Sequence, residues 1–383
     1  MRPRVTLVAA GAGENSAVNS RIGGFIRGFV QRGWDIIIID PASSSVTVAD
    51  RLLSHLPAAL RSMLERAGIE GDVRPAAGWR TRHGLRAVAT DVMVVSVPPF
   101  SLLGAAAVTR DPRVPLVVDY RDPWSARHHP PPLARATRTI ERYTLRRAAA
   151  VIYAGGPVLG DLLIQHLRLA PDTVMSVPNG FEPADTANLR AVPVRPERNG
   201  TPLDLVMSGY WYGRNGPGIL LDALKCVGSA VAGLTVIGGI SPPIAGRLRR
   251  ATGHPLAPAP ARSRRALYER LHHADAAVVT MNTASAVESR IPAKVYDYLA
   301  TGVPVIAVCP PGAALLQIPE ARHFHHIHHR DTTGLAALLR RAMQDRATLC
   351  QTSLTSSSRG AAPTATRPIA ALGSSQAAAV TRS

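Results

Sequence analysis

A lysine and an aspartate lie three residues apart near the start of a short predicted helix. Pro292 favours the first turn of this helix, and Gly302 ends it before an apolar strand at 303–308. Lys294, in the first turn, opposes the helix dipole unless an anion binds there. Asp297, on the same face, could accept hydrogen bonds from ribose hydroxyls. The spacing fits a nucleotide site, and it also fits a surface ion pair worth under about 1 kcal/mol.

A second polar group, DYRDPW at 119–124, follows a predicted buried strand. Open α/β sheets bind ligands at the carboxyl ends of their strands, and two carboxylates beside an arginine can shift one another's pKa. Asp122 is therefore a candidate base or acceptor-orienting group, and His128 or His129 could be the base instead. An ion-paired turn that anchors the loop explains the same residues.

Two glycine-containing loops also follow predicted strands. Gly13 lies in GAGEN, which lacks the full dinucleotide-binding spacing but lets backbone N–H groups approach a ligand. Gly209 opens GYWYGRNG after the first strand of the second half, and Arg214 in that loop could bind a phosphate with two hydrogen bonds. Both loops could therefore bind an anionic group.

The stretch from Pro292 to Val305 resembles the P-x-K-x-x-E-Y-L-x-x-G-x-P-V segment of glycosyltransferases of family 4, which have the GT-B fold. The resemblance implies that Lys294 neighbours a donor diphosphate and that Asp297, where the family usually has Glu, binds the ribose. It adds Tyr298 as a donor-binding residue. The family's second acid would fall at Ser289, one residue from Glu288, which is the donor-binding candidate there. Gly209 and Arg214 are similar to the family's donor loop.

The first half of the chain carries the same resemblance. Asn19 and Arg21 are similar to an N-R segment that opens the first helix, which implies a place on the acceptor side and contact with a phosphate. A helix cap at Asn19 or Ser20 is the alternative. DYRDPW is similar to a segment in one branch of the family, so Arg121 and Trp124, with Gly13, are expected on the acceptor side.

Alternating strands and helices predict an α/β protein of GT-B type, with two Rossmann-like parallel-sheet domains facing a central cleft. The expected parts are an acceptor-binding domain at 1–185, a linker at 186–202, a donor-binding domain at 203–347 and a disordered, low-complexity tail at 348–383.

The formal charge of +18 comes almost entirely from arginine, because the chain has only two lysines. Such a charge suits an anionic membrane or a polyanion, but no basic run is interleaved with aromatic residues, which argues against nucleic acid. Three scattered cysteines fit a reducing compartment, and no apolar run is long enough for a membrane helix. We expect a cytoplasmic protein that could contact the inner membrane face peripherally.

Metal chemistry is not expected. The histidines in 323–329 could chelate a metal, but no cysteine or acidic cluster accompanies them. The chain has no Asp-x-Asp, so Lys294, Arg214 and helix N-termini would neutralise a diphosphate without a metal or other cofactor.

The resemblance implies a metal-independent glycosyltransferase. It would move a sugar from a nucleotide diphosphate sugar to a hydroxyl of a glycan, a lipid-linked glycan or a small natural product. A nucleotide-sugar epimerase of similar architecture and a non-catalytic member that binds a nucleotide sugar are the alternatives.

Overall fold

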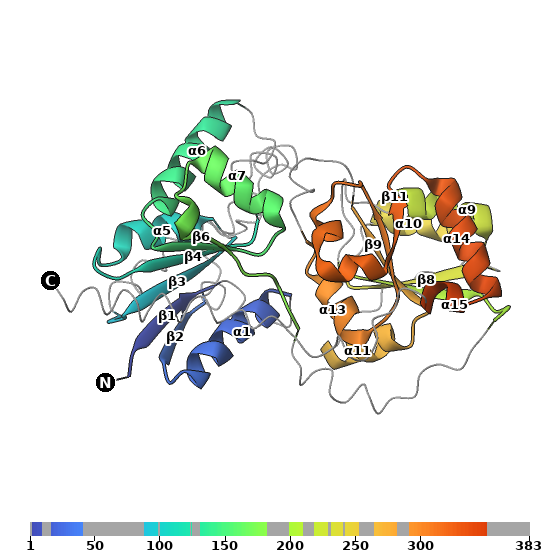
Figure 1. The fold of residues 1–383 in the computed structure, drawn as a ribbon, viewed down its shortest axis with the longest axis horizontal. Helices are drawn as coiled ribbons and strands as arrows, with labels where there is room; N and C mark the ends of the chain where they lie inside the picture. Colours follow the sequence, from blue (N-terminus) through green and yellow to red (C-terminus); the bar gives the residue numbers. More distant parts are fainter. Residues whose placement is uncertain are drawn as a thin grey trace. The chain divides into compact units, whose positions relative to one another are not determined.

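Figure 1 shows the computed structural model of the chain. It describes residues 2–9, 17–40, 88–98, 100–122, 124, 131–181, 199–209, 218–228, 231–239, 242–252, 264–281 and 291–350. These residues form two compact units that divide between Asn179 and Gly180, called unit 1 and unit 2 below.

Unit 1 is built on a parallel sheet whose order is β2-β1-β3-β4-β5-β6. Most of its strands are apolar and buried on both faces, as expected where helices cover a parallel sheet. The strands are β1 (Arg4–Val8), β2 (Asp35–Ile39), β3 (Val92–Val97), β4 (Leu116–Tyr120), β5 (Ala150–Tyr153) and β6 (Val174–Ser176).

Helices cover both faces of this sheet (Figure 1). One face packs on α1 (Ala17–Gln31) through apolar residues that include Phe25. The other face packs on α5 (Ser101–Thr109), α6 (Pro131–Leu145) and α7 (Pro157–Leu167), which lie side by side. A short 3₁₀ turn, η2 (Pro171–Thr173), precedes β6.

Unit 2 contains a second parallel sheet, with the order β11-β10-β9-β7-β8. Its strands are β7 (Leu203–Ser208), β8 (Ala232–Ile237), β9 (Ala276–Thr280), β10 (Val305–Cys309) and β11 (Phe324–His328). β8 pairs on one side of β7 and β9 on the other, so the strand order reverses between β7 and β9. Such a reversal is where open α/β sheets bind ligands.

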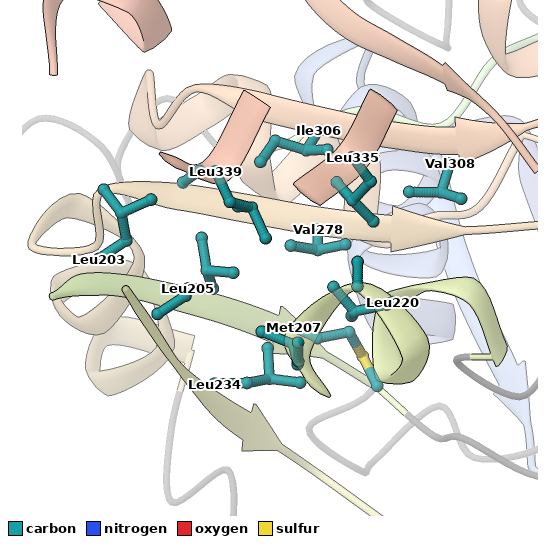
Figure 2. Packing of buried hydrophobic residues seen from close by; sticks show 14 of the residues in the cluster. Leu203, Leu205, Met207, Leu220, Leu234, Val278, Ile306, Val308, Leu335 and Leu339 are labelled. Carbon is teal, nitrogen blue, oxygen red and sulfur yellow. The ribbon is translucent and has the colours of Figure 1, made fainter. Parts of the chain in front are cut away.

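Two hydrophobic layers hold unit 2 together. On one face, Leu205, Val278 and Ile306 from the sheet pack against Leu335 and Leu339 of α14 (Figure 2). The helices of that face are α9 (Gly218–Val227), α10 (Pro242–Thr252), α14 (Thr332–Gln344) and α15 (Ala347–Cys350). The opposite face carries α11 (Arg264–His272), α13 (Lys294–Thr301) and the 3₁₀ turns η5 (Ala314–Gln317) and η6 (Pro319–His323).

The apolar strand expected at 303–308 is β10, which begins two residues and ends one residue later than predicted. The helix expected after Pro292 is α13, which ends at Gly302 in a left-handed conformation with φ 69°. The alternative of a helix cap at Asn19 or Ser20 is wrong, because α1 already begins at Ala17. No helix in the described part of the chain is long and apolar enough to cross a membrane.

Two predicted boundaries need correction. The tail was expected to begin at 348, but α15 includes Leu349, which is buried in unit 2. Four residues assigned to the linker, 199–202, are held by Arg346, which donates to the carbonyl oxygens of Thr201 and Pro202. The rest of the predicted linker and of the tail lies outside the described residues.

Candidate functional site

The candidate site lies where β7 and β9 part. β7 pairs with β8 over six residues but with β9 over only two, Leu205↔Ala276 and Val206↔Ala277. Beyond Val206 the carboxyl ends of the two strands separate, at the point where the strand order reverses. Side chains from α13 enter this region.

Tyr298 fills the separation. Its hydroxyl accepts a hydrogen bond from the Ser208 backbone N–H (3.0 Å) and donates one to the Val278 carbonyl (3.4 Å). The side chain is completely buried, and burial raises its pKa to about 12, so it remains a neutral phenol. These contacts are structural, and the predicted direct contact of Tyr298 with a donor is untested.

Replacing Tyr298 by Phe should therefore destabilise unit 2. The change leaves the Ser208 N–H and the Val278 carbonyl without this partner in a buried place, which costs about 1–3 kcal/mol. Urea denaturation measures the loss. Tyr143→Phe, at an exposed position of unit 1, is the control and should change stability by under about 0.5 kcal/mol. Equal stability of the two variants would contradict the structural role.

Lys294 is a half-buried cation without an acidic partner in the described part of the chain. Its ammonium donates to the thioether of Met207, with Nζ and Sδ 3.4 Å apart. A thioether is a weak acceptor and carries no charge. Burial lowers the pKa of Lys294 from 10.5 to about 8, because no nearby carboxylate offsets the cost of desolvation.

One glycine lies against this lysine, and a second glycine lies against the first. Gly209, after β7, has φ 92°, and a Cβ built on it would lie 3.4 Å from Lys294 Nζ. Gly238, after β8, has φ 122°, and a Cβ there would lie 2.5 Å from the Gly209 carbonyl oxygen. A side chain at Gly238 would therefore force the two strand ends apart. Gly238 was not among the residues expected from the sequence, although a Gly-Gly pair directly after a strand was the available signal.

Asp297 lies one turn along α13 from Lys294 and is 8% exposed. Its Oδ1 accepts from the Tyr268 hydroxyl at 3.0 Å and from Arg264 at 3.5 Å. Both partners come from α11, and the Arg264 guanidinium lies over the Tyr268 ring. Sequence reasoning did not identify either partner, because no local pattern links α11 to α13.

The geometry suits a phosphate-bearing ligand. A desolvated ammonium beside a glycine turn, at a helix N-terminus and a strand reversal, offers positive charge that the described protein atoms do not neutralise. Asp297, held from α11, is the carboxylate available one turn away. Predicted donor residues Arg214 and Glu288 lie outside the described residues.

In unit 1 the polar centre is an ion pair inside the sheet. Arg21 donates to Oδ1 of Asp119 through Nε (2.8 Å) and one terminal nitrogen (2.7 Å), and both side chains are almost completely buried. Ser96 donates to the other carboxylate oxygen of Asp119 at 2.7 Å. The pair therefore joins α1 to the carboxyl ends of β3 and β4.

The second terminal nitrogen of Arg21 extends this network to the end of unit 1. It donates to the backbone carbonyl oxygen of Val177 at 2.7 Å, and it also lies 3.3 Å from the carbonyl oxygen of Pro178 and from the side-chain oxygen Oδ1 of Asn179. Each side-chain nitrogen of Arg21 thus has a protein acceptor. The contacts are structural, and the predicted contact of Arg21 with an acceptor or a phosphate is untested.

The DYRDPW segment is anchored by aromatic contacts. The Trp124 ring stacks on Phe100 with ring centroids 4.9 Å apart, and the backbone N–H of Trp124 donates to the Tyr120 hydroxyl at 2.7 Å. That hydroxyl in turn donates to Glu141 of α6. These contacts are structural, and neither the predicted role of Trp124 in acceptor binding nor the alternative of an ion-paired turn is tested by them.

The two charged residues of the segment follow β4. Arg121 donates to the Pro98 carbonyl, and burial is the main cause that lowers its pKa. Asp122 is half-buried just after β4, and its predicted role as a base or acceptor-orienting group is untested. Asn19 lies in the first turn of α1, and Gly13 and His128 lie outside the described residues.

The histidine-rich segment forms β11, at one edge of the described sheet. His325 and His326 contact the backbone carbonyls of Leu349 and Cys309, respectively. The parts of the chain that the structure describes contain no group of three or more His, Cys, Asp or Glu placed to hold a metal ion.

The comparison with protein families gives a match in unit 1. Residues 16–180 match the model of the glycosyl transferase 4-like domain. The match agrees with the resemblance found in the N-terminal segments, and it stops where unit 1 ends. A search of curated proteins found no match.

Solved structures extend the likeness to both units. The Anabaena protein HepE, in complex with UDP and glucose, has a TM-score of 0.59 and 13% identity over 100% of both chains. The E. coli trehalose-6-phosphate protein bound with UDP-2-fluoro glucose has a TM-score of 0.59 and 14% identity, over 91% of this chain and 93% of that one. The α,α-trehalose 6-phosphate synthase of Burkholderia multivorans has a TM-score of 0.63 and 13% identity, over 99% of this chain and 100% of that one. The chain therefore has the GT-B fold, as predicted.

Proposed function

We propose that this chain is a glycosyltransferase that moves a hexose from a nucleotide diphosphate sugar to an acceptor hydroxyl. The observation that carries the proposal is Lys294, a desolvated cation beside Gly209 without an acidic partner among the described residues. The GT-B fold supports it, and two similar structures hold UDP with glucose or UDP-2-fluoro glucose. We therefore propose a UDP-sugar as the first donor to test.

The proposed reaction breaks the bond between the sugar C1 and the diphosphate oxygen and forms a bond from C1 to the acceptor oxygen. Lys294 would stabilise the negative charge that develops on the leaving diphosphate, with Arg214 as its partner and without a metal. Asp297 would accept hydrogen bonds from the ribose. Asp122 would remove the acceptor proton if the reaction inverts C1, and retention would need no such base.

The proposal includes a cytoplasmic location and an acceptor that is a glycan, a lipid-linked glycan or a small natural product. The scattered cysteines support the first part, since two of them are free thiols, one buried and one exposed. The arginine-rich composition supports contact with an anionic membrane.

Calorimetric titration of UDP, GDP and TDP tests the donor. We expect one of the three nucleotides, with UDP the favoured one, to bind with a dissociation constant in the micromolar range or lower. Release of UDP from UDP-glucose should require an acceptor hydroxyl. Conversion of UDP-glucose into another UDP-sugar without an acceptor would favour the epimerase. Binding without turnover across an acceptor panel would favour the non-catalytic alternative, and absence of binding by all three nucleotides would contradict the proposal.

UDP affinity should fall as the pH rises above about 8. In the free protein the pKa of Lys294 is about 8, and a bound diphosphate would raise it, so binding above pH 8 takes up a proton. The dissociation constant should rise towards tenfold per pH unit between pH 8 and 9. Calorimetry in buffers of different ionisation enthalpy measures the proton uptake. A flat profile with no proton uptake would contradict this role of Lys294.

The same residue should affect folding with the opposite sign. Between pH 8 and 10.5 the unfolded chain keeps the proton on Lys294 while the folded chain releases it. This group therefore makes the free energy of unfolding increase with pH in that window. The pH slope contributed by this residue should disappear in Lys294→Met.

A further inference from the structure

The outward face of α6 exposes large apolar side chains. Among the described residues, the exposed large hydrophobic side chains all belong to unit 1, and four of the six lie on α5, α6 and α7. Ile140 and Tyr143, 50% and 54% exposed, are one turn apart on α6. Apolar side chains that stay in water do not stabilise the isolated unit. A cluster of them on one surface is typical of a site that contacts a partner.

Exposed arginines lie on the same helix and in the turn that follows it. They are Arg135, Arg138, Arg146 and Arg147. The helix has one acid, Glu141, and it is completely buried, where it accepts a hydrogen bond from Tyr120. The outward face of α6 therefore has positive charge that no carboxylate of its own helix offsets. Exposed acids on the adjoining helices and turns include Asp111 and Asp161.

One of the arginines lies against the exposed tyrosine. The Arg147 guanidinium stacks over the Tyr143 ring at 3.5 Å and donates to the Tyr143 carbonyl. Arg110, at the end of α5, donates to the Arg147 carbonyl and brings another cation to the same edge. A tyrosine between arginines combines an apolar ring with a polar tip, a combination that suits the headgroup region of a bilayer.

We propose that the α6 surface, formed by Arg135, Arg138, Ile140, Tyr143, Arg146 and Arg147, docks unit 1 on an anionic lipid bilayer. The positive arginines are complementary to anionic lipid headgroups. The two apolar side chains can enter the interfacial region of the bilayer, whereas a soluble polyanion would leave them in water. This inference rests on the membrane contact included in the proposed function and assigns that contact to one surface, and it does not depend on the identity of the donor.

The arginine-rich composition supplies its own control. α10 of unit 2 also exposes three arginines, Arg247, Arg249 and Arg250, but none of the exposed large hydrophobic side chains lies on it. If arginine alone caused membrane binding, α10 and α6 would contribute equally. If the α6 surface is the docking face, only the substitutions on α6 should matter.

Co-sedimentation with vesicles tests this proposal on the full chain. The vesicles contain phosphatidylcholine with or without phosphatidylglycerol. We expect binding that requires phosphatidylglycerol, and about fivefold weaker partitioning for each α6 arginine removed, or roughly a hundredfold for Arg135→Gln, Arg138→Gln and Arg146→Gln together. The triple variant Arg247→Gln, Arg249→Gln and Arg250→Gln should partition nearly like the wild type.

A second variant tests the apolar part. Ile140→Ser with Tyr143→Ser keeps every charge, and it should lose the fraction of binding that survives high salt. Absence of wild-type binding to phosphatidylglycerol vesicles, or equal losses in the α6 and α10 variants, would overturn the proposal. Loss of single-stranded RNA affinity in the α6 variant, with vesicle binding intact, would overturn it in favour of a nucleic acid.

Nucleotide titration separates this proposal from the transfer reaction. The α6 variants should retain their circular dichroism and any UDP affinity of the wild type, because the α6 surface belongs to unit 1 and Lys294 to unit 2. Vesicle binding by a chain that binds no nucleotide would support the docking surface and count against the proposed donor site alone.

Discussion

Replacing Arg21 by Met should destabilise unit 1 by about 3–5 kcal/mol, because it leaves a buried carboxylate without its cation. Asp119 is completely buried, and Arg21 supplies two of its hydrogen bonds at 2.7 and 2.8 Å. The same substitution removes the donor to the Val177 carbonyl at the end of unit 1. Met retains much of the side-chain volume, so the loss measures the unpaired charge more than a cavity.

Urea denaturation followed by tryptophan fluorescence measures this change, with Trp34 and Trp124 as probes in unit 1. Arg32→Met is the matched control, since Arg32 ends the same helical region, is exposed, and donates to the Gly28 carbonyl. It should change stability by under about 0.5 kcal/mol. A loss of unfolding free energy below about 1 kcal/mol for Arg21→Met would show that the buried carboxylate of Asp119 does not need Arg21 as its cation.

Replacing Lys294 by Met should weaken UDP binding at least tenfold while leaving the unliganded chain equally stable or more stable. A hydrogen bond to a charged group is worth about 1.5–3 kcal/mol, which corresponds to roughly ten- to more than a hundredfold in affinity. In the unliganded chain, Lys294 contributes a desolvated ammonium whose described partner is the Met207 thioether. An apolar side chain of similar length removes the cost of desolvation.

The opposite signs of these two effects distinguish an anion site from an ion pair. If Lys294 stabilised the fold through an ion pair with a carboxylate of the protein, Lys294→Met would lose stability as well as UDP affinity. Lys225→Met is the matched control, because it removes the chain's other lysine, which is exposed and pairs with Asp222 at 3.3 Å. Stability and UDP affinity should both be unchanged in Lys225→Met, and equal losses in the two variants would contradict the site.

The contrast between Arg21 and Lys294 bears on function. Both are cations at the carboxyl edge of a parallel sheet, and both were expected near ligands. Protein acceptors bind each side-chain nitrogen of Arg21, whereas Lys294 has a thioether. A cation whose acceptors are already present holds the fold together, and one that lacks them has more to gain from a ligand.

The sequence alone determined the fold class, the strands and the places where polar residues leave them. Apolar runs, glycine and proline act over a few residues, so β7, β10 and the end of α13 at Gly302 could be predicted locally. The same local patterns placed Lys294 and Asp122 at the carboxyl edges of their sheets.

Only the tertiary structure decided which of those polar residues serve the fold. Arg21 and Asp119 are 98 residues apart, and Tyr268 and Asp297 are 29 apart, so no periodicity links them. The place of Tyr298 depends on β7 and β9 parting after two paired residues, which is a property of sheet order. The burial of a polar side chain and its hydrogen-bond partners are both set by these long-range contacts. The free energy of a buried polar group depends on which protein atoms replace the water that would otherwise bind it.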